Sequence, residues 1–220
     1  MNQRTGATML FGAFQFVLRA LAARGWPCAT PEFATSEDKF AEYGALTSNF
    51  AFNEQQGTFD ALTLRGVIPH GPPRAHRRRF VVVFRHANAN KPHAQAMVQR
   101  EDEQTTETEC KSTGTCMVVV QQQPLTQQAK AVLCEAFGRV DTFTYDACAF
   151  DAMQNVQVPS HRRLHRAERE RLFARMAKAD LPQMLHTDPV CAWFGWKRGA
   201  VVEVQQQRHC GLVRSFRIVT

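Results

Sequence analysis

The sequence contains no run of about twenty apolar residues, the length that a helix needs to cross a lipid bilayer. It also contains no Cys-x-x-Cys pair, and its seven cysteines are odd in number. Structural zinc sites use closely spaced ligand pairs, and disulfide frameworks use even numbers of cysteines. We therefore expect no membrane segment, no metal site, and reduced, mostly buried thiols in a cytosolic or nuclear compartment.

Acidic residues are absent from the first 31 positions, where Arg4, Arg19 and Arg24 stand. A mitochondrial transit peptide has this composition, and so does an ordinary amphipathic helix. The larger apolar side chains of this segment fall on one face of a helix: Leu10, Phe14, Val17, Leu18 and Leu21. We expect a core helix over residues 7–24 rather than a targeting segment.

The chain has ample apolar material for a core, at 44% hydrophobic residues, and a net charge of +7. Several segments show the pattern of an element: strands at 80–84, 116–120 and 140–145, and helices at 36–43 and 127–137. Residues from about 86 to 115 are rich in Asn, Gln, Thr and charge, which predicts an exposed or disordered polar insertion. We expect an α/β domain over residues 1–150 and a small α+β domain over residues 151–220.

Sequence signals for a short capped helix and a hairpin follow one another closely near the C-terminus. Asp188 can cap the start of a helix, with Pro189 at the first helical position, and Gly195 stands where a left-handed residue would end it. Two strand-like runs, 200–206 and 213–219, then predict a hairpin. The order of short motifs is Leu181-Pro182, Asp188-Pro189-Val190, Trp193-Phe194-Gly195, Lys197-Arg198-Gly199, Val201-Val202, Gly211 and Phe216-Arg217.

This ordered set resembles the C-terminal assembly domain of the shared fifth subunit of eukaryotic nuclear RNA polymerases, and the small archaeal RNA polymerase protein that corresponds to that domain. Val158-Pro159-Ser160-His161 is similar to the V-P-x-H junction that leads into it. The resemblance implies a non-catalytic subunit of a multi-subunit DNA-directed RNA polymerase, present in single copy in a hetero-oligomer and needing no cofactor. Catalysis would belong to the two large subunits.

The resemblance also implies that residues 151–220 dock on the largest subunit, among the other subunits. The assembly residues that it indicates are Pro159, His161, Leu181, Pro182, Asp188, Pro189, Val190, Trp193, Phe194, Gly195, Lys197, Arg198, Gly199 and Arg217. The expected location is the nucleus, or the nucleolus if the chain belongs to the polymerase that makes ribosomal RNA.

The order of elements in residues 1–150 resembles the jaw domain of the eukaryotic subunit, which the archaeal protein lacks. A chain with both parts looks eukaryotic, or derived from a large DNA virus. In the family, a threonine-led segment after a strand approaches downstream duplex DNA. The corresponding residues here are Thr126, Gln127, Gln128 and Lys130, with the two glutamines in place of small residues.

The jaw fold is similar to that of restriction-type nucleases, whose metal site needs an Asp and then an acid-x-Lys motif on adjacent strands. Glu109-Cys110-Lys111 has the motif, but it lies in the polar insertion. The chain also has no Ser-His-Asp, Cys-His or phosphate-loop signature. We expect a restriction-nuclease-like but catalytically inert jaw. The alternative is a stand-alone, restriction-type, metal-dependent nuclease or another nucleic-acid-processing protein.

A basic helix is expected over residues 166–178, with three apolar side chains facing inward: Leu172, Phe173 and Met176. Its arginines could meet phosphate or acidic segments of a partner protein, and we expect the partner protein. In the hairpin, polar residues stand where the family tends to have Lys and Arg: Glu203, Gln205, Gln206 and Gln207. These changes predict a surface adapted to a divergent largest subunit.

Overall fold

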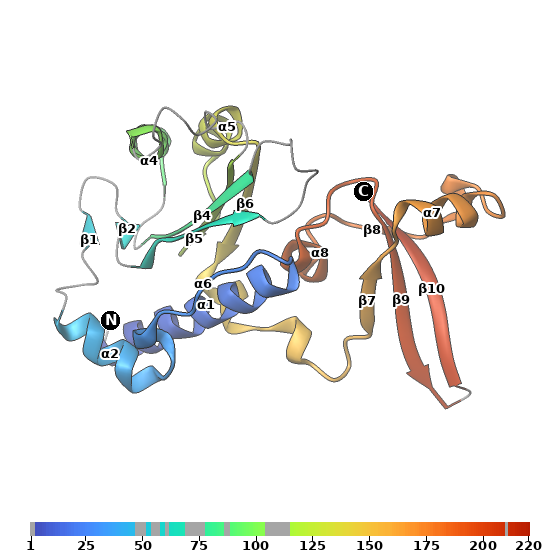
Figure 1. The fold of residues 1–220 in the computed structure, drawn as a ribbon, viewed down its shortest axis with the longest axis horizontal. Coiled ribbons are helices and arrows are strands. Elements are labelled where there is room, and N and C mark those ends of the chain that lie inside the picture. The colour runs from blue at the N-terminus through green and yellow to red at the C-terminus, as the bar shows by residue number, and fades with distance from the viewer. Residues whose placement is uncertain are drawn as a thin grey trace. The chain divides into compact units, whose positions relative to one another are not determined.

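The computed structural model describes residues 3–46, 52–53, 58–59, 62–68, 78–85, 89–103, 115–209 and 211–220. The chain forms two compact units, Met1–Phe150 and Asp151–Thr220, and each has a four-stranded sheet of its own (Figure 1). The fold of both units is mixed α/β. Across these ranges, none of the helices combines the length and the apolar character that crossing a membrane requires.

The sheet of the first unit has the order β3-β4-β5-β6. Its strands are β3 (Leu64–Ile68), β4 (Arg78–Phe84), β5 (Thr115–Gln121) and β6 (Arg139–Thr144). The pairs β4–β5 and β5–β6 are parallel, and β3 joins β4 antiparallel. Central parallel strands are buried on both faces, which explains why β4 and β5 contain the unbroken apolar runs that predicted them.

Helices cover the two faces of this sheet (Figure 1). They are α1 (Gln3–Ala23), α2 (Glu37–Leu46), α4 (Lys91–Glu103), α5 (Gln127–Ala136) and α6 (Tyr145–Ala149), with a 3-10 turn, η1 (Glu32–Ala34). Val81 and Val83 of β4 pack with residues of α4 and α5. The alternate residue Phe84 meets Phe14 of α1, with ring centroids 5.4 Å apart. A separate pair of short strands comprises β1 (Phe52–Asn53) and β2 (Thr58–Phe59).

Part of the expected polar insertion is helical, so disorder, one of the two alternatives, was wrong over residues 91–103. Asn90 begins α4, because its side-chain oxygen accepts a hydrogen bond from the His93 N–H at 3.2 Å. Ala94 and Met97, three residues apart, are buried in the core beneath this helix. Two buried apolar residues in a segment that is largely polar are too few to show the spacing of a helix in the sequence. Residues 86–88 and 104–114 lie outside the described residues.

The second unit has the sheet order β7-β9-β10-β8. Its elements are η4 (Ala152–Gln154), β7 (Ser160–Arg163), α7 (Arg166–Phe173), η5 (Lys178–Asp180), β8 (Gln183–Met184), α8 (Pro189–Phe194), β9 (Val201–Arg208) and β10 (Gly211–Val219). The hairpin β9–β10 is antiparallel, as the sequence predicted. Strand β7 flanks β9 antiparallel, and β8 flanks β10 parallel.

Strand β9 is covered on both faces. Val202 and Val204 pack with Val190 and Cys191 of α8. The alternate residue Val201 packs on the other side, in a cluster that Leu172 and Phe173 of α7 also join. The four residues from Val201 to Val204 are therefore all buried, although β9 belongs to a sheet of only four strands.

Two expected helix ends differ from the structure. Helix α7 ends at Phe173 rather than at residue 178, because the N–H groups of Arg175 and Met176 both bond to the Leu172 carbonyl and tighten the last turn. Met176 is consequently 40% exposed instead of facing inward. Helix α2 continues through Gly44 to Leu46, whereas the sequence predicted an end at residue 43.

Candidate partner interface in the C-terminal unit

Helix α8 is fixed at both ends by the residues that the sequence singled out. The Asp188 carboxylate accepts a hydrogen bond from the Val190 N–H at 2.9 Å, and Pro189 occupies the first helical position. Gly195 ends the helix with φ 64° and ψ 36°, a left-handed conformation that glycine adopts without steric cost. The Trp196 N–H then bonds to the Cys191 carbonyl at 3.0 Å. The predicted start and end of this helix are confirmed.

The turn after α8 carries two cations. The Ala200 N–H bonds to the Lys197 carbonyl at 3.0 Å, and the Gly199 N–H bonds to the Val219 carbonyl at 2.8 Å. Gly199 has φ 83°, so a side chain there would be strained. These bonds join the turn to the end of β10 and leave Lys197 and Arg198 exposed. One Arg198 Nη atom lies 3.3 Å from His186 Nδ1.

His161 lies on the same side of the sheet as α8. It pairs across strands with Val204, and Arg217 pairs with Val202. Its Nδ1 donates to the Pro159 carbonyl at 2.6 Å, since a carbonyl can only accept. Burial lowers the pKa of His161, the charge of Arg217 lowers it further, and the Asp188 carboxylate acts in the opposite direction. The histidine is thus held as a neutral donor near both charges.

The fourteen residues that the resemblance indicated fall into three groups by exposure. The exposed ones are Pro182, Pro189, Lys197, Arg198, Gly199 and Arg217. The half-buried ones are Pro159, His161, Asp188 and Phe194. The buried ones are Leu181, Val190, Trp193 and Gly195. Only the first two groups can touch a partner without rearrangement, while the buried residues hold the shape of the unit.

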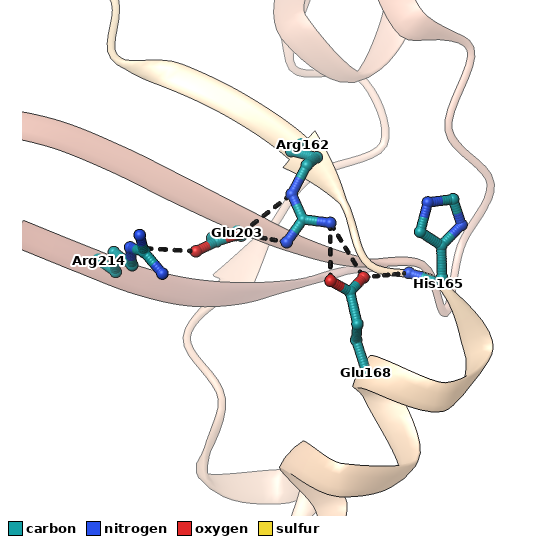
Figure 2. Close-up of polar contacts among 5 residues, drawn as sticks. All are labelled: Arg162, His165, Glu168, Glu203 and Arg214. Atoms are coloured by element: carbon teal, nitrogen blue, oxygen red, sulfur yellow. Dashed lines mark hydrogen bonds and ion pairs between the residues drawn. The ribbon is translucent and has the colours of Figure 1, made fainter.

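A network of charges on the α7 side was missed by sequence reasoning (Figure 2). Glu203 of β9 is 3% exposed, and one carboxylate oxygen accepts from Arg162 Nε of β7 at 3.1 Å. Its other oxygen lies 3.7 Å from Arg214 Nε of β10. Glu203 is therefore satisfied inside the unit, and its assignment to an adapted partner surface was wrong. The three glutamines of β9 differ, because Gln206 and Gln207 are exposed and Gln205 is half-buried.

The same network reaches the start of α7. Arg162 Nη1 donates to both oxygens of Glu168 at 2.9 Å, and Glu168 accepts from the His165 N–H at 2.8 Å (Figure 2). The His165 N–H and the Arg162 guanidinium hold the pKa of Glu168 below its usual value. Hydrogen bonds to Glu203 and Glu168 raise the pKa of Arg162. Three strands and one helix are thus joined through a single arginine–glutamate chain.

In the first unit, the segment expected to approach DNA begins α5. Thr126 caps this helix, because its hydroxyl accepts from the Ala129 N–H at 3.3 Å. Gln121 is buried at the end of β5. Its amide nitrogen donates to the Gln123 carbonyl in the loop before α5, and its amide oxygen accepts from the Ala89 N–H at 3.2 Å. Gln127, Gln128 and Lys130 are exposed. The helix and its cap are confirmed, and the DNA contact stays a prediction.

The strands of the first unit's four-stranded sheet contain one carboxylate, and it forms ion pairs within the unit. Asp141 of β6 pairs with Arg24 Nη1 at 2.7 Å and with Arg139 Nε at 2.9 Å. In the described part of the chain, no three His, Cys, Asp or Glu side chains gather as a metal site requires. Glu109-Cys110-Lys111 lies outside the described residues. Nothing in the described structure supports a nuclease.

The thiols that the structure describes are free cysteines. Burial raises the pKa of Cys148 to about 12 and that of Cys191 to about 11, so both are protonated at neutral pH. Cys28 and Cys116 are half-buried, whereas Cys134 is exposed. Most of these thiols are therefore at least partly withdrawn from solvent.

Comparison with protein families identifies the second unit. Residues 150–219 match the model of the family described as RNA polymerase Rpb5, C-terminal domain. The matched range runs from η4 to the last residue of β10 and contains α8 with its aspartate cap and glycine end. Residues 150–219 of this chain are thus an Rpb5-type C-terminal domain, the domain of an RNA polymerase subunit.

Proposed function

We propose that the chain is a non-catalytic subunit of a multi-subunit DNA-directed RNA polymerase, present in single copy and located in the nucleus. The observation that carries the proposal is the Rpb5-type C-terminal domain over residues 150–219. The catalytic metal and nucleotide chemistry then belong to the large subunits. A nucleolar location follows if the polymerase is the one that makes ribosomal RNA.

Residues 151–220 dock on the largest subunit through the α8 side of the sheet. The exposed groups there include Pro189 at the start of the helix, Lys197 and Arg198 in the turn after it, and Arg217 on the neighbouring strand. The backbone bonds of Gly199 and Ala200 hold this turn against β10. Cations on a rigid turn are well placed to meet carboxylates of a partner with little loss of side-chain freedom.

The first unit forms part of the jaw that contacts downstream duplex DNA. The support is the exposed start of α5, where Gln127, Gln128 and Lys130 follow the capping threonine. The first N–H groups of a helix have no intrahelical acceptor, and they attract phosphate. Amide side chains can add hydrogen bonds to phosphate oxygens without reading sequence.

Affinity purification of the tagged full-length chain tests the assembly. The two large catalytic subunits should co-purify in stoichiometric amounts, and Lys197→Glu/Arg198→Glu should reduce their recovery. Lys39→Glu/Lys91→Glu is the matched control, because it makes the same charge change at exposed residues of the first unit, outside the unit proposed to dock. Purification without the large subunits, or Mg²⁺-dependent DNA cleavage by the isolated chain, would contradict the proposal.

A further inference from the structure

Positive charge is distributed unequally between the two units. Residues 151–220 contain twelve Lys and Arg against six Asp and Glu, whereas residues 1–150 contain fifteen against fourteen. The second unit therefore accounts for six of the seven net positive charges. A net charge concentrated on one small unit attracts a negatively charged partner to that unit.

Part of this charge surrounds a hollow at the start of α7. The hollow has a volume of about 330 Å³ and is lined by Arg163, Leu164, His165, Arg166 and Arg169. We call it the basic pocket. Leu164 is buried and joins the core, and the other four lining residues are three arginines and a histidine. A volume of this size admits a few side chains of a partner.

The cations of the basic pocket are poorly neutralised within the chain. No ion pair joins Arg163 or Arg169 to any carboxylate of the described residues. Arg166 pairs with Glu170 at 2.8 Å, but both side chains are largely exposed, and such pairs between exposed groups are weak and easily exchanged. Arg163 pairs with Val202 across the strands, so its side chain faces the α8 side. The pocket thus presents the guanidinium groups of Arg166 and Arg169, which can donate to carboxylates of a partner.

We propose that the basic pocket binds a short acidic segment of a protein partner, with Asp or Glu carboxylates pairing with Arg166 and Arg169. A neighbouring arginine of the same unit already uses this chemistry. Arg162 binds both oxygens of Glu168 and one of Glu203, and each contact is a guanidinium–carboxylate pair. The planar guanidinium fork matches the two oxygens of a carboxylate.

Two observations favour an acidic peptide over nucleic acid. Glu168 and Glu170 lie on the same helix as Arg166 and Arg169, so the helix lacks the continuous row of cations that follows a nucleic-acid backbone. The pocket lining also contains no Phe, Tyr or Trp on which an unpaired base could stack. A small pocket whose arginines stand among carboxylates suits a peptide in which acidic and neutral side chains alternate.

The pocket differs in its elements from the docking side proposed above. Helix α7 and Leu164 join the core cluster of Val201 and Ile218, whereas α8 joins that of Val202 and Val219. Since alternate residues of a strand point to opposite faces, the two helices cover different faces of the sheet. The inference therefore does not depend on docking to the largest subunit, and an acidic segment can occupy the pocket while α8 is engaged.

Fluorescence anisotropy with the full-length chain tests the inference directly. The probes are a short fluorescein-labelled peptide rich in Glu and Asp, the same peptide with Gln and Asn in place of the acids, and charge-matched single-stranded and duplex DNA. The acidic peptide should bind, the amide peptide should not, and the affinity should fall with added salt. Arg166→Glu/Arg169→Glu should weaken binding roughly tenfold, as expected for the loss of two partly exposed charge pairs.

Lys178→Glu/Arg208→Glu is the matched control, with the same change of charge outside the pocket, and it should bind the peptide like the unmodified chain. Thermal melting shows that both variants remain folded. If the control weakened peptide binding equally, the cause would be the overall charge of the chain rather than the pocket, and the inference would be overturned. So would DNA binding that is tighter than peptide binding and lost in Arg166→Glu/Arg169→Glu, because the pocket would then be a nucleic-acid site. No polymerase takes part in this assay, so its outcome is distinct from that of co-purification.

Discussion

Replacing Glu203 by lysine should destabilise the second unit strongly. The carboxylate is 3% exposed and faces Arg162 and Arg214, so the change places a third cation among two others on a covered face of β9. Breaking a buried ion pair and leaving an uncompensated charge costs about 3–5 kcal/mol. The arginine side chains are 46% and 61% exposed and can turn towards water, so we expect about 3 kcal/mol, the lower end of that range.

Thermal unfolding of the full-length chain measures this effect. For a unit of this size, about 3 kcal/mol lowers the melting temperature by roughly 12–24 °C. Two of the three tryptophans, Trp193 and Trp196, lie in the second unit, so tryptophan fluorescence reports mainly on its transition. Glu170→Lys is the matched control, because it makes the same charge change at a side chain that is 61% exposed. That change should cost less than about 0.5 kcal/mol.

A second variant tests whether the charge pair is the cause. Arg162→Glu in the Glu203→Lys background restores an attraction between β7 and β9, and it should recover part of the lost melting temperature. The reasoning is refuted if Glu203→Lys melts like the unmodified chain, or if Glu170→Lys is equally harmful. It is also refuted if the double variant is less stable than Glu203→Lys alone.

Three further predictions concern the other features of the two units. Asp188→Ala should lower the stability of the second unit by about 1 kcal/mol through loss of the α8 cap, while Asp188→Asn should keep most of it; equal melting of both variants would contradict the cap. Gln127→Glu/Gln128→Glu should weaken downstream DNA binding by the assembled enzyme and change its salt dependence, and unchanged crosslinking to DNA would remove α5 from the interface. The pKa of His161 is lowered by burial relative to an unfolded value of about 6.5, so its contribution to stability is present above that pH and is lost as the pH falls towards the folded pKa. Urea unfolding of the unmodified chain should show this loss of stability at acid pH, and the loss should be smaller in His161→Gln.

Local backbone chemistry was the most predictable part of this chain. Asp188, Pro189 and Gly195 act through contacts within a few residues, so their positions define α8 without knowledge of the rest of the fold. Thr126 begins α5 for the same reason. The apolar run from Phe80 to Phe84 also predicted its element, because a short unbroken apolar run is typical of a strand that is buried on both faces.

Features that depend on distant partners were not predictable. Strand β7 has the sequence Ser-His-Arg-Arg, which has no apolar alternation, and it forms because β9 supplies its hydrogen bonds. Glu203 looks like a surface residue until the register places it opposite Arg162. Helix α4 was not predicted for a related reason, since Ala94 and Met97 are its only fully buried residues, and Val98 packs against the core in part.

Glu203 also bears on how the hairpin finds its alignment. Strand β9 is apolar on both sides at Val201, Val202 and Val204, so hydrophobicity alone discriminates poorly between one alignment and another shifted by a residue. A shift of that kind would turn the carboxylate to the α8 side, where it would lie among the apolar side chains around Val190 and away from both arginines. Desolvation without a partner makes that arrangement costly. A single buried charge therefore fixes the strand register, because it favours one pairing of β9 with its neighbours among several that the apolar residues would tolerate.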